Sequence, residues 1–367
     1  MRGRRLLIFN AGSSTLKASV LAEGSNDAEA SVNVPMRAAE DAGTAVRRVL
    51  DEMTAAGTDL ATIGAVGHRV VHGGSRFTHT TVIDDDVLRG IRELAWLAPL
   101  HNPVAVAVIE AARSALPKVP QAAAFDSGFH ATLPKEAYVY AVPFEWYSDW
   151  GYRRYGFHGL SVSWSVERTA ALLKRSDLGV VVAHLGAGCS VTAVWQGRSA
   201  STSMGMTPLE GLVMATRAGS VDAGILLAAQ RDHGLDPRAL EDALEHRSGL
   251  LALSGKSADM KELLALAPTD ERAGFAVAVF ERSAAAGIAA AATALPRLDA
   301  IVFTGGIGEH AASVRTGIVR RLASIGVVAA REPEGEGDRV LIDRPIATLV
   351  VIAREDVVVA REVEALR

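Results

Sequence analysis

The chain has 367 residues, which is long enough for two domains that each bury a core. With 49% apolar and 22% charged residues it is not a disordered chain, and a net charge of −4 gives no electrostatic basis for binding nucleic acid or an anionic membrane. The single cysteine, Cys189, excludes an internal disulfide and most cysteine-built metal sites, and the apolar run at 6–9 is too short for a signal peptide. We therefore expect a soluble protein of the cytoplasm.

The first half of the sequence predicts an α/β arrangement in which strands alternate with helices. In chain order, the predicted elements are a strand–turn–strand unit at 6–20, a helix at 41–56, a strand at 63–71, a helix at 103–116 and a strand at 121–126. An aromatic, irregular connector follows at 144–155, and we place the domain boundary there, near residue 150.

The second half repeats this order, which predicts a duplicated fold. Its predicted elements are strands at 180–184, 190–195 and 198–202, helices through 210–295, strands at 300–303 and 348–352, and a final helix at 355–366. The alanine-rich stretch 284–294 is below membrane-spanning length and predicts a buried helix. The predicted lobes are 1–150 and 151–354, and we expect the last helix, about 355–367, to pack back on the first lobe.

One construction occurs once in each half. An apolar strand leads into a turn of small residues and then into a strand rich in β-branched residues, first around Gly12 and again around Gly186 and Gly188. Turns of glycine and other small residues leave backbone N–H groups open to an anion. Two such turns predict two lobes that face each other across a phosphate-bearing ligand.

Polar side chains interrupt or follow the apolar strands at several points. Arg69 stands within an apolar strand and Arg217 in a polar segment. Arg69 is either a surface cation or a buried arginine, and a buried arginine needs a carboxylate or phosphate. Asp126 ends a strand, so it either caps the next helix or holds a divalent cation. His158 lies between two glycines, Gly156 and Gly159. The turn at 304–309 offers a helix N-terminus to a nucleotide. Together these features favour phosphoryl transfer to or from an anion.

Four longer motifs, in this order and spacing, resemble the acetokinase family of the actin-like, sugar-kinase-like ATPases. They are Asn10-Ala11-Gly12-Ser13-Ser14, the run from Gly67 to Gly74, the run from Arg154 to Gly159 and the run from Thr202 to Gly211. The resemblance covers Asn10 to Glu362. It implies two duplicated RNase H-like lobes around a central nucleotide cleft, ATP with magnesium (or manganese), and a homodimer. The implied activity is that of a phosphotransferase with a carboxyl acceptor, which transfers phosphoryl from ATP to acetate, reversibly and in line.

The resemblance also implies site residues, by matching position. The catalytic set would be Arg69 and Arg217, which neutralise the carboxylate and the transferring phosphoryl group, with His158 as a hydrogen-bond donor and Asp126 positioning substrate and metal. Asn10 and Glu355 would hold the metal. The nucleotide and its phosphates would be bound by Asn10, Ser13, Thr15, Lys17, His184, Gly186, Gly188, Asp259, Lys261, Gly306, Ile307 and Gly308. The small apolar substrate pocket would be lined by Val71, Leu100, Phe157 and Pro208. His101 would be a supporting histidine.

Several positions depart from the family pattern. Ala187 stands for an asparagine of the second phosphate turn, and Lys261 for an arginine against the adenine. After His158, Leu160 and Val162 replace a threonine and a histidine. The triplet Arg354-Glu355-Asp356 replaces Asn-Glu-Glu, so Asp356 is an alternative to Glu355 as the metal acid.

Three alternatives stand beside acetate kinase activity. The first is a kinase for a longer acid such as propionate or butyrate, although Val71 leaves less room than the smaller residue typical of propionate kinases. The second is a catalytically impaired nucleotide-binding homologue, which the departures at 160, 162 and 187 would favour. The third is a different phosphoryl donor, such as pyrophosphate.

Overall fold

The computed structural model describes residues 5–12, 15–36, 39–329 and 335–366, and the chain divides into two compact units. Unit 1 consists of Met1–Ala131, Phe157–Trp164 and Arg354–Arg367, and unit 2 of Thr132–Gly156 and Ser165–Ala353. The segment 132–150, which the sequence analysis assigns to the first lobe, is thus grouped with unit 2. The C-terminal segment from Arg354 is grouped with unit 1.

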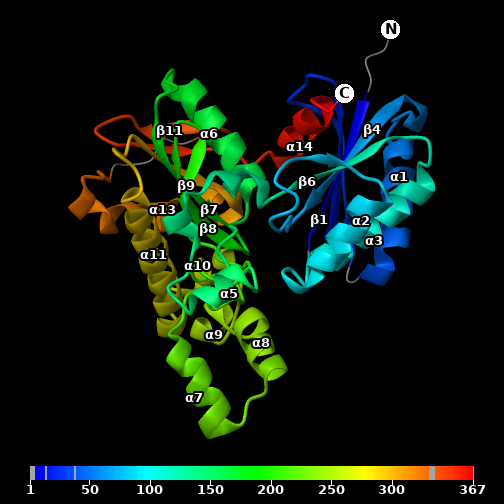
Figure 1. Cartoon of the computed structure of the whole chain (residues 1–367). Coiled ribbons are helices and arrows are strands. Elements are labelled where there is room, and N and C mark those ends of the chain that lie inside the picture. Colours follow the sequence, from blue (N-terminus) through cyan, green and yellow to red (C-terminus); the bar gives the residue numbers. More distant parts are fainter. Residues whose placement is uncertain (1–4, 13–14, 37–38, 330–334, 367) are drawn as a thin grey trace. The chain divides into compact units, whose positions relative to one another are not determined.

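The described part of unit 1 contains a six-stranded sheet in the order β3-β2-β1-β4-β6-β5. Its strands β1, β4 and β6 are labelled in Figure 1. Its strands are β1 (Arg5–Ala11), β2 (Thr15–Ala22), β3 (Ala28–Pro35), β4 (Ile63–Val70), β5 (Thr81–Val82) and β6 (Gln121–Phe125). β1, β4 and β6 are parallel, whereas β2, β3 and β5 are antiparallel to their neighbours. The three parallel strands therefore end at one edge of the sheet, where Asn10, Arg69 and Asp126 stand.

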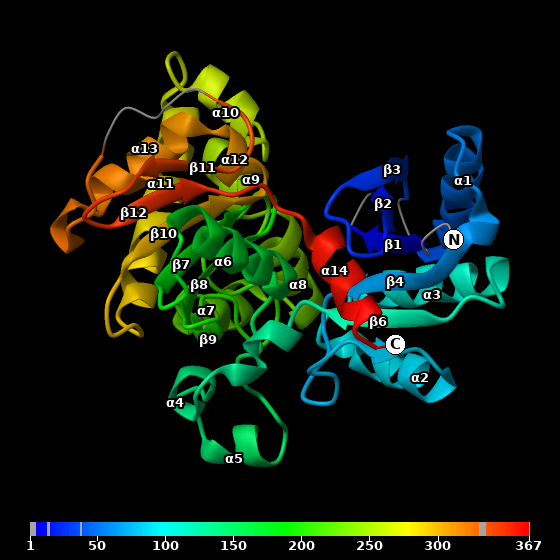
Figure 2. The same ribbon diagram turned by 90° about the horizontal axis from the view of Figure 1, so that it is seen from above.

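Helices cover both faces of this sheet. They are α1 (Ala42–Ala55), α2 (Asp85–Glu93), α3 (Asn102–Ala115) and α14 (Glu355–Glu364), with short 3₁₀ turns η1 (Ala39–Asp41), η2 (Leu60–Thr62), η3 (Leu94–Trp96) and η4 (Gly128–Thr132). Leu7 and Phe9 of β1 join a buried cluster with α1 and α3. Ile8 points to the other face, where a Cβ atom at Gly67 would lie 2.7 Å from Val359 of α14. Because strand residues alternate between faces, α14 packs opposite α1 and α3 (Figure 2).

The described part of unit 2 contains a second six-stranded sheet, in the order β11-β12-β10-β7-β8-β9. Its strands are β7 (Gly179–Leu185), β8 (Cys189–Trp195), β9 (Arg198–Thr202), β10 (Ala300–Thr304), β11 (Arg339–Ile342) and β12 (Ala347–Val350). The order and the directions match those of unit 1, with β7, β8, β9, β10, β12 and β11 in the places of β1, β2, β3, β4, β6 and β5. This correspondence confirms the predicted duplication.

The helices of unit 2 include one long apolar helix, α11. They are α4 (Lys135–Tyr138), α5 (Phe144–Ser148), α7 (Ala223–His233), α8 (Pro237–His246), α9 (Gly249–Ser254), α10 (Met260–Leu266), α11 (Glu271–Ala292), α12 (Gly305–His310), α13 (Ala312–Arg321) and the turn η5 (Ala323–Ile325); α6 (Gly159–Leu173) begins in unit 1 and continues into unit 2. By length and composition alone, α11 could cross a membrane. One of its faces, which includes Ala276, Phe280 and Ala284, is buried, and the helix contacts β7 and β8, so it is a core helix of this unit.

Several elements of the structure were not predicted, among them α2, α6, β5, β11 and the helix α5 within the connector predicted to be irregular. The strand β3 was not predicted, because its alternating pattern consists largely of Ala, Ser, Glu and Asn, which are weak strand formers. The helices predicted to begin at 210 begin only with α7 at Ala223. The preceding segment contains Gly211 and Gly219 at φ +113° and +74°, conformations that are outside the helical region.

Candidate active site

Arg69 and Asp126 lie side by side at the ends of two neighbouring parallel strands. The register of β4 and β6 pairs Arg69 with Ala124, and the N–H of Asp126 continues the ladder to the carbonyl O of Val70 at 3.0 Å. Nε of Arg69 lies 3.0 Å from each carboxylate oxygen of Asp126, and Nη2 also donates to Oδ2. The sheet thus brings two of the predicted catalytic residues into direct contact.

Asn10 and Glu355 complete this group from β1 and from the first turn of α14. Nη1 of Arg69 donates to Oδ1 of Asn10 at 2.9 Å, and Nδ2 of Asn10 donates to Oε2 of Glu355 at 2.8 Å. The same Glu355 oxygen is 3.5 Å from Nε of Arg69. We call Asn10, Arg69, Asp126 and Glu355 the Arg69 cluster.

Glu355, and not Asp356, is the acid that joins the Arg69 cluster. Asp356 accepts two hydrogen bonds from Arg354, at 2.9 and 3.0 Å, and one from Oγ of Ser19 at 3.3 Å. The Arg354–Asp356 pair therefore replaces an asparagine and an acid of the family pattern with a local ion pair, and leaves the neighbouring Glu355 in the cluster.

The oxygen donors of the Arg69 cluster fit a divalent cation that is shared with a substrate. Magnesium in proteins is commonly held by one or two carboxylates together with substrate phosphates and water. The cluster offers the carboxylates of Asp126 and Glu355 and the amide oxygen of Asn10. Within the described ranges, no group of three or more His, Cys, Asp and Glu residues could hold a metal by itself. The donor set is thus suited to a metal–phosphate complex and not to a closed metal site.

Burial makes the electrostatics of the Arg69 cluster strong. The side chains of Asp126, Glu355 and Arg69 are only 1%, 14% and 15% exposed. Burial raises the pKa of Asp126 to about 6, against the opposing effect of the Arg69 guanidinium. Burial alone would lower the pKa of Arg69, but the charges of Asp126 and Glu355 outweigh it and raise the pKa above its usual value. One guanidinium thus faces two carboxylates, an excess of negative charge that a divalent cation would offset.

The turn that carries His158 is fixed against Asp126. His158 has φ +58°, an uncommon conformation for a residue with a side chain, and one often found at functional sites. The N–H of Gly159 donates to the carbonyl O of Asp126 at 2.9 Å, and a Cβ atom at Gly159 would lie only 2.2 Å from that oxygen. Nε2 of His130 lies 2.9 Å from the carbonyl O of Phe157. Hydrogen bonds on both sides of His158 therefore place it beside the Arg69 cluster.

In unit 2, the second phosphate turn lies next to the start of α12, which follows β10 directly. The N–H of Gly186 donates to the carbonyl O of Gly188 at 3.1 Å, which closes the turn of the β7–β8 hairpin. A Cβ atom at Gly186 would lie 3.8 Å from the backbone N of Gly306 and 3.9 Å from Nε2 of His184. One at Gly305 would lie 3.1 Å from the same His184 nitrogen. Four predicted nucleotide residues, His184, Gly186, Gly188 and Gly306, are thus neighbours.

Ile307 and Gly308 continue this site into α12, which two side chains missed by sequence reasoning hold in place. Arg315 is buried and donates through Nη1 to the carbonyl O atoms of Gly308 and Glu309, at 2.7 and 2.9 Å. Oε1 of Glu309 accepts the N–H groups of Gly305 and Ala353, each at 2.9 Å. Neither role has a sequence signal, because each depends on which loops the fold brings together.

Arg217 also lies in unit 2, on the irregular segment 203–222. Its Nε is 2.9 Å from Oε2 of Glu245, and its Nη1 donates to the carbonyl O of Pro208 at 3.3 Å. The structure therefore brings two predicted site residues, Arg217 and Pro208, together, and adds Glu245, which the sequence analysis did not single out.

A family model described as the acetokinase family matches residues 22–361. The chain belongs to the acetokinase family. The acetate kinase of Deinococcus radiodurans is 42% identical over 97% of this chain and 96% of its own length, and the propionate kinase of Salmonella typhimurium is 39% identical over 95% and 92%. The solved structure of Porphyromonas gingivalis acetate kinase matches with a TM-score of 0.87 at 29% identity, over 99% of this chain and 100% of that one. These matches confirm the predicted family and fold class.

Three of the four residues predicted to line the acyl pocket of this acetokinase-family chain belong to unit 1. Val71 and Phe157 are buried, and Leu100 is 39% exposed, whereas Pro208 belongs to unit 2. Asn102 is a buried side chain that the sequence analysis missed. Its amide exchanges hydrogen bonds with the backbone of His72, at 3.1 and 3.0 Å, and so ties the loop of Leu100 to the end of β4.

The remaining predicted residues of this acetokinase-family chain occupy less distinctive places. Lys17 is exposed and lies opposite Asn10 in the β1–β2 hairpin, where Thr15 accepts the N–H of Gly12 through its carbonyl O at 2.8 Å. Ser13 lies outside the described residues.

The carboxylate of Asp259 accepts the N–H groups of Lys261 and Glu262 and so caps α10. Lys261 is exposed, and His101 stands at the N-terminal boundary of α3. Their roles stay predictions.

The structure shows the surroundings of three residues that depart from the acetokinase pattern. Leu160 and Val162 are buried in α6, so this helix turn contributes packing in place of polar groups. Ala187 has no side-chain amide, but its carbonyl O accepts the N–H of Ala215 at 3.1 Å, which links the phosphate turn to the segment of Arg217. Backbone hydrogen bonds therefore support the phosphate turn without an asparagine side chain at this position.

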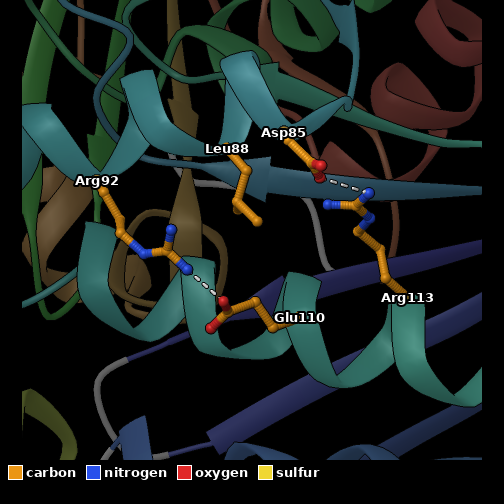
Figure 3. A pocket seen from close by; sticks show the side chains of 5 residues that line it. All are labelled: Asp85, Leu88, Arg92, Glu110 and Arg113. Atoms are coloured by element: carbon orange, nitrogen blue, oxygen red, sulfur yellow. Dashed lines mark hydrogen bonds and ion pairs between the residues drawn. The ribbon is translucent and has the colours of Figure 1, made fainter.

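A cavity of about 320 Å³ between α2 and α3 is separate from all of these residues (Figure 3). The side chains around it are Asp85, Leu88, Arg92, Glu110 and Arg113. Its charges pair with each other across the hollow: Nη2 of Arg113 is 2.9 Å from Asp85, and Arg92 contacts Glu110. Because none of the candidate residues lines it and its charges are already paired, it is not a candidate for the active site of an acetokinase.

Replacing His130 with glutamine is expected to reduce the loss of stability on acidification. Burial lowers the pKa of His130 from 6.5 to about 4. Between these values the unfolded chain binds more protons than the folded chain, so the stabilising contribution is complete above pH 6.5 and is lost as pH falls through 4. The change is up to about 1.4 kcal/mol per pH unit. Urea unfolding at neutral and mildly acid pH, followed by circular dichroism, measures it.

The exposed His310 supplies the control for this experiment. Its side chain is 78% exposed, so H310Q controls for the replacement of a surface histidine by glutamine. Asp126, with its raised pKa, contributes in the opposite sense: its stabilisation is present below 3.8 and is lost as pH rises through about 6. That contribution is common to all three proteins and cancels. An H130Q protein with the wild-type slope would contradict the prediction.

Proposed function

We propose that this chain is an acetate kinase, which transfers the γ-phosphoryl group of ATP to acetate and forms acetyl phosphate and ADP reversibly. The observation that carries the proposal is the Arg69 cluster, in which a guanidinium, two acids and an amide meet at the ends of three strands beside the His158 turn. Relatives named acetate kinase, 42% and 45% identical, support it.

In the proposed reaction, a carboxylate oxygen of acetate attacks the γ-phosphorus while the bond to the β–γ bridging oxygen breaks. The Arg69 guanidinium would attract the acetate carboxylate, and Val71 and Phe157 would exclude water from its methyl group. Arg217 and His158 would donate hydrogen bonds to the phosphoryl oxygens. The protein would thus act mainly by positioning and charge neutralisation, which is the usual contribution of a protein to phosphoryl transfer.

The oxygen donors of Asn10, Asp126 and Glu355 support magnesium, or manganese, as the accompanying cation. When bound, the cation would supply charge neutralisation at the phosphates. His184, Gly186 and the first residues of α12, from Gly306 to Gly308, would bind ATP, with backbone N–H groups facing its phosphates. Asp259 would face the ribose.

The testing experiment is phosphoryl transfer from magnesium-ATP to acetate, trapped as the hydroxamate. Propionate, butyrate and pyrophosphate are run in parallel, and EDTA tests the need for the cation. Turnover highest with acetate supports the proposal. If a folded protein that binds ATP showed no turnover with any of these acids or donors, the proposal would be wrong. The chain would then be a catalytically impaired nucleotide-binding protein.

A propionate kinase is the second candidate, because relatives with that name are 39% identical in sequence and reach a TM-score of 0.85 in structure. Val71 argues for the smaller acid. Its side chain is buried, 8% exposed, beside the end of β4, so a propionate methyl would compete with it for space.

Replacing Val71 with alanine is therefore expected to raise the ratio of kcat/KM for propionate to that for acetate by about tenfold, since one methylene in an apolar pocket is worth roughly 1–3 kcal/mol. Parallel hydroxamate assays measure the ratio. Val82, which is 52% exposed, provides the control, and V82A should leave the ratio unchanged. A V71A protein with the wild-type ratio would show that Val71 does not contact the acid.

We also propose a cytoplasmic homodimer. An ATP-dependent reaction needs the compartment that supplies ATP. α7 presents Ile225 and Leu227 at 60% and 62% exposure, and none of its residues is buried in the described chain, which supports a partner on this helix. Sedimentation velocity at several concentrations tests the oligomeric state.

A further inference from the structure

Arg217 stands on a segment whose own secondary structure does not order it. Residues 203–222 form neither helix nor strand. Hydrogen bonds to neighbouring elements hold this segment instead, and several of them come from the C-terminal end of α8 and the residues just after it. The N–H of Ala218 donates to the carbonyl O of Leu244 at 3.0 Å, Oγ1 of Thr216 to the carbonyl O of Glu245 at 2.7 Å, and the N–H of Ser248 to the carbonyl O of Thr216 at 2.9 Å. The backbone around Arg217 is thus bound to the end of α8, and the N–H groups of Leu250 and Leu251 in α9 donate to the carbonyl O atoms of Met214 and Ala215 at 2.9 and 3.0 Å.

The side chain of Arg217 is held by the same helix end. Its Nε is 2.9 Å from Oε2 of Glu245, and the two side chains are 16% and 13% exposed. Oε2 of Glu245 is buried and, among the described residues, has no hydrogen-bond partner, so the contact is a charge pair and not an aligned hydrogen bond. Nη1 donates to the carbonyl O of Pro208 at 3.3 Å, so the guanidinium has a charge pair at Nε and a hydrogen bond at Nη1.

The burial of Glu245 is not explained by core packing of α8. No residue of this helix is buried, and its acids Glu241 and Asp242 are exposed. Asp242 forms an ordinary surface pair with Arg247, at 2.6 Å, with side chains 53% and 61% exposed. A carboxylate that is mostly removed from water needs a compensating charge. Arg217 supplies that charge for Glu245.

From this geometry we infer that Glu245 is a positioning residue for Arg217, which aims the guanidinium at the transferring phosphoryl group without touching the substrate. The inference rests on the proposed function. Glu245 would do for Arg217 what Asp126 does for Arg69: each arginine has a mostly buried carboxylate at Nε, which restricts how the planar guanidinium can turn.

The test is a double-mutant cycle on kcat with R217A, E245Q and the double variant. R217A should lower kcat by about a thousandfold or more, as expected for loss of an arginine that stabilises a phosphoryl transition state. E245Q keeps the shape of the side chain and removes its charge, and should lower kcat by about tenfold to a hundredfold with little change in KM for ATP. In the R217A background, E245Q should have no further effect on kcat, because Glu245 acts only through Arg217.

The matched control is D242N, which removes the exposed acid of the same helix and should retain wild-type kinetics. E245D, which restores the charge on a shorter side chain, should recover part of the activity lost in E245Q. If the wild type is active and E245Q is equally active, the inference about Glu245 is wrong and the proposed function stands. The inference also fails if E245Q lowers kcat by the same factor with and without Arg217, because Glu245 would then act only on general stability. A wild type with no turnover overturns the proposed function as well.

Discussion

Replacing Arg69 with lysine is expected to lower kcat for acetyl phosphate formation by about a thousandfold or more, while the protein stays folded. Lysine keeps the positive charge but not the planar fork. Arg69 uses that fork to reach both oxygens of Asp126 and Oδ1 of Asn10 at once, with three of its nitrogens engaged. A single ammonium cannot reproduce these directions, so the cluster loses its geometry more than its charge.

Lysine is a better test than alanine because of Asp126. The Asp126 side chain is 1% exposed, and R69A would leave it without its counter-ion. Breaking a buried ion pair in this way destabilises a protein by about 3–5 kcal/mol, so lost activity could reflect unfolding. Hydroxamate assays and thermal melts of R69K are compared with R92K, since Arg92 is a half-exposed arginine of the same unit. If R69K retained kcat within about tenfold of R92K, the catalytic role of Arg69 would be wrong.

The family resemblance predicted Arg69 and Asp126 as members of one catalytic set, and the structure gives the reason for their contact, because the parallel strands β4 and β6 end at the same edge of the sheet. Arg69 and Asp126 stand near the ends of apolar runs, and the α/β pattern makes β4 and β6 neighbours. The choice between Glu355 and Asp356 could not be made in this way. It depends on the direction in which the first turn of α14 meets the sheet, since adjacent helix residues point about 100° apart.

The residues that support the site could not be predicted from the sequence, for a different reason. Glu245 lies on a helix whose charged pattern is typical of a solvent-exposed surface, and its partner Arg217 is on an irregular segment whose path no periodicity predicts. Asn102 stands at the start of α3, where an asparagine ordinarily indicates a helix cap. In the structure its amide serves the backbone of His72, and that pairing exists only after β4 and α3 have packed together.

Replacing Gly159 with alanine is expected to lower kcat by about a hundredfold or more and to destabilise the protein by about 1–3 kcal/mol. A Cβ atom there would lie 2.2 Å from the carbonyl O of Asp126 and 2.7 Å from Cβ of Phe129. The first of these is a backbone atom of Asp126, so it cannot move aside as a flexible side chain would. The turn must shift instead, and it carries His158 with it.

The experiment separates this effect from the general effect of adding a methyl group. Gly274 lies within α11, and a Cβ atom there would lie 3.5 Å from the carbonyl O of Ala267, an ordinary contact. G274A should therefore keep wild-type kcat and raise stability by about 0.5–1 kcal/mol, because alanine favours a helix interior over glycine. His158 already occupies the uncommon φ of +58°. Its backbone therefore has little room to adjust and relieve the contact of the new methyl group in G159A. A G159A protein as active as G274A would mean that the contact between the His158 turn and Asp126 does not set the catalytic geometry.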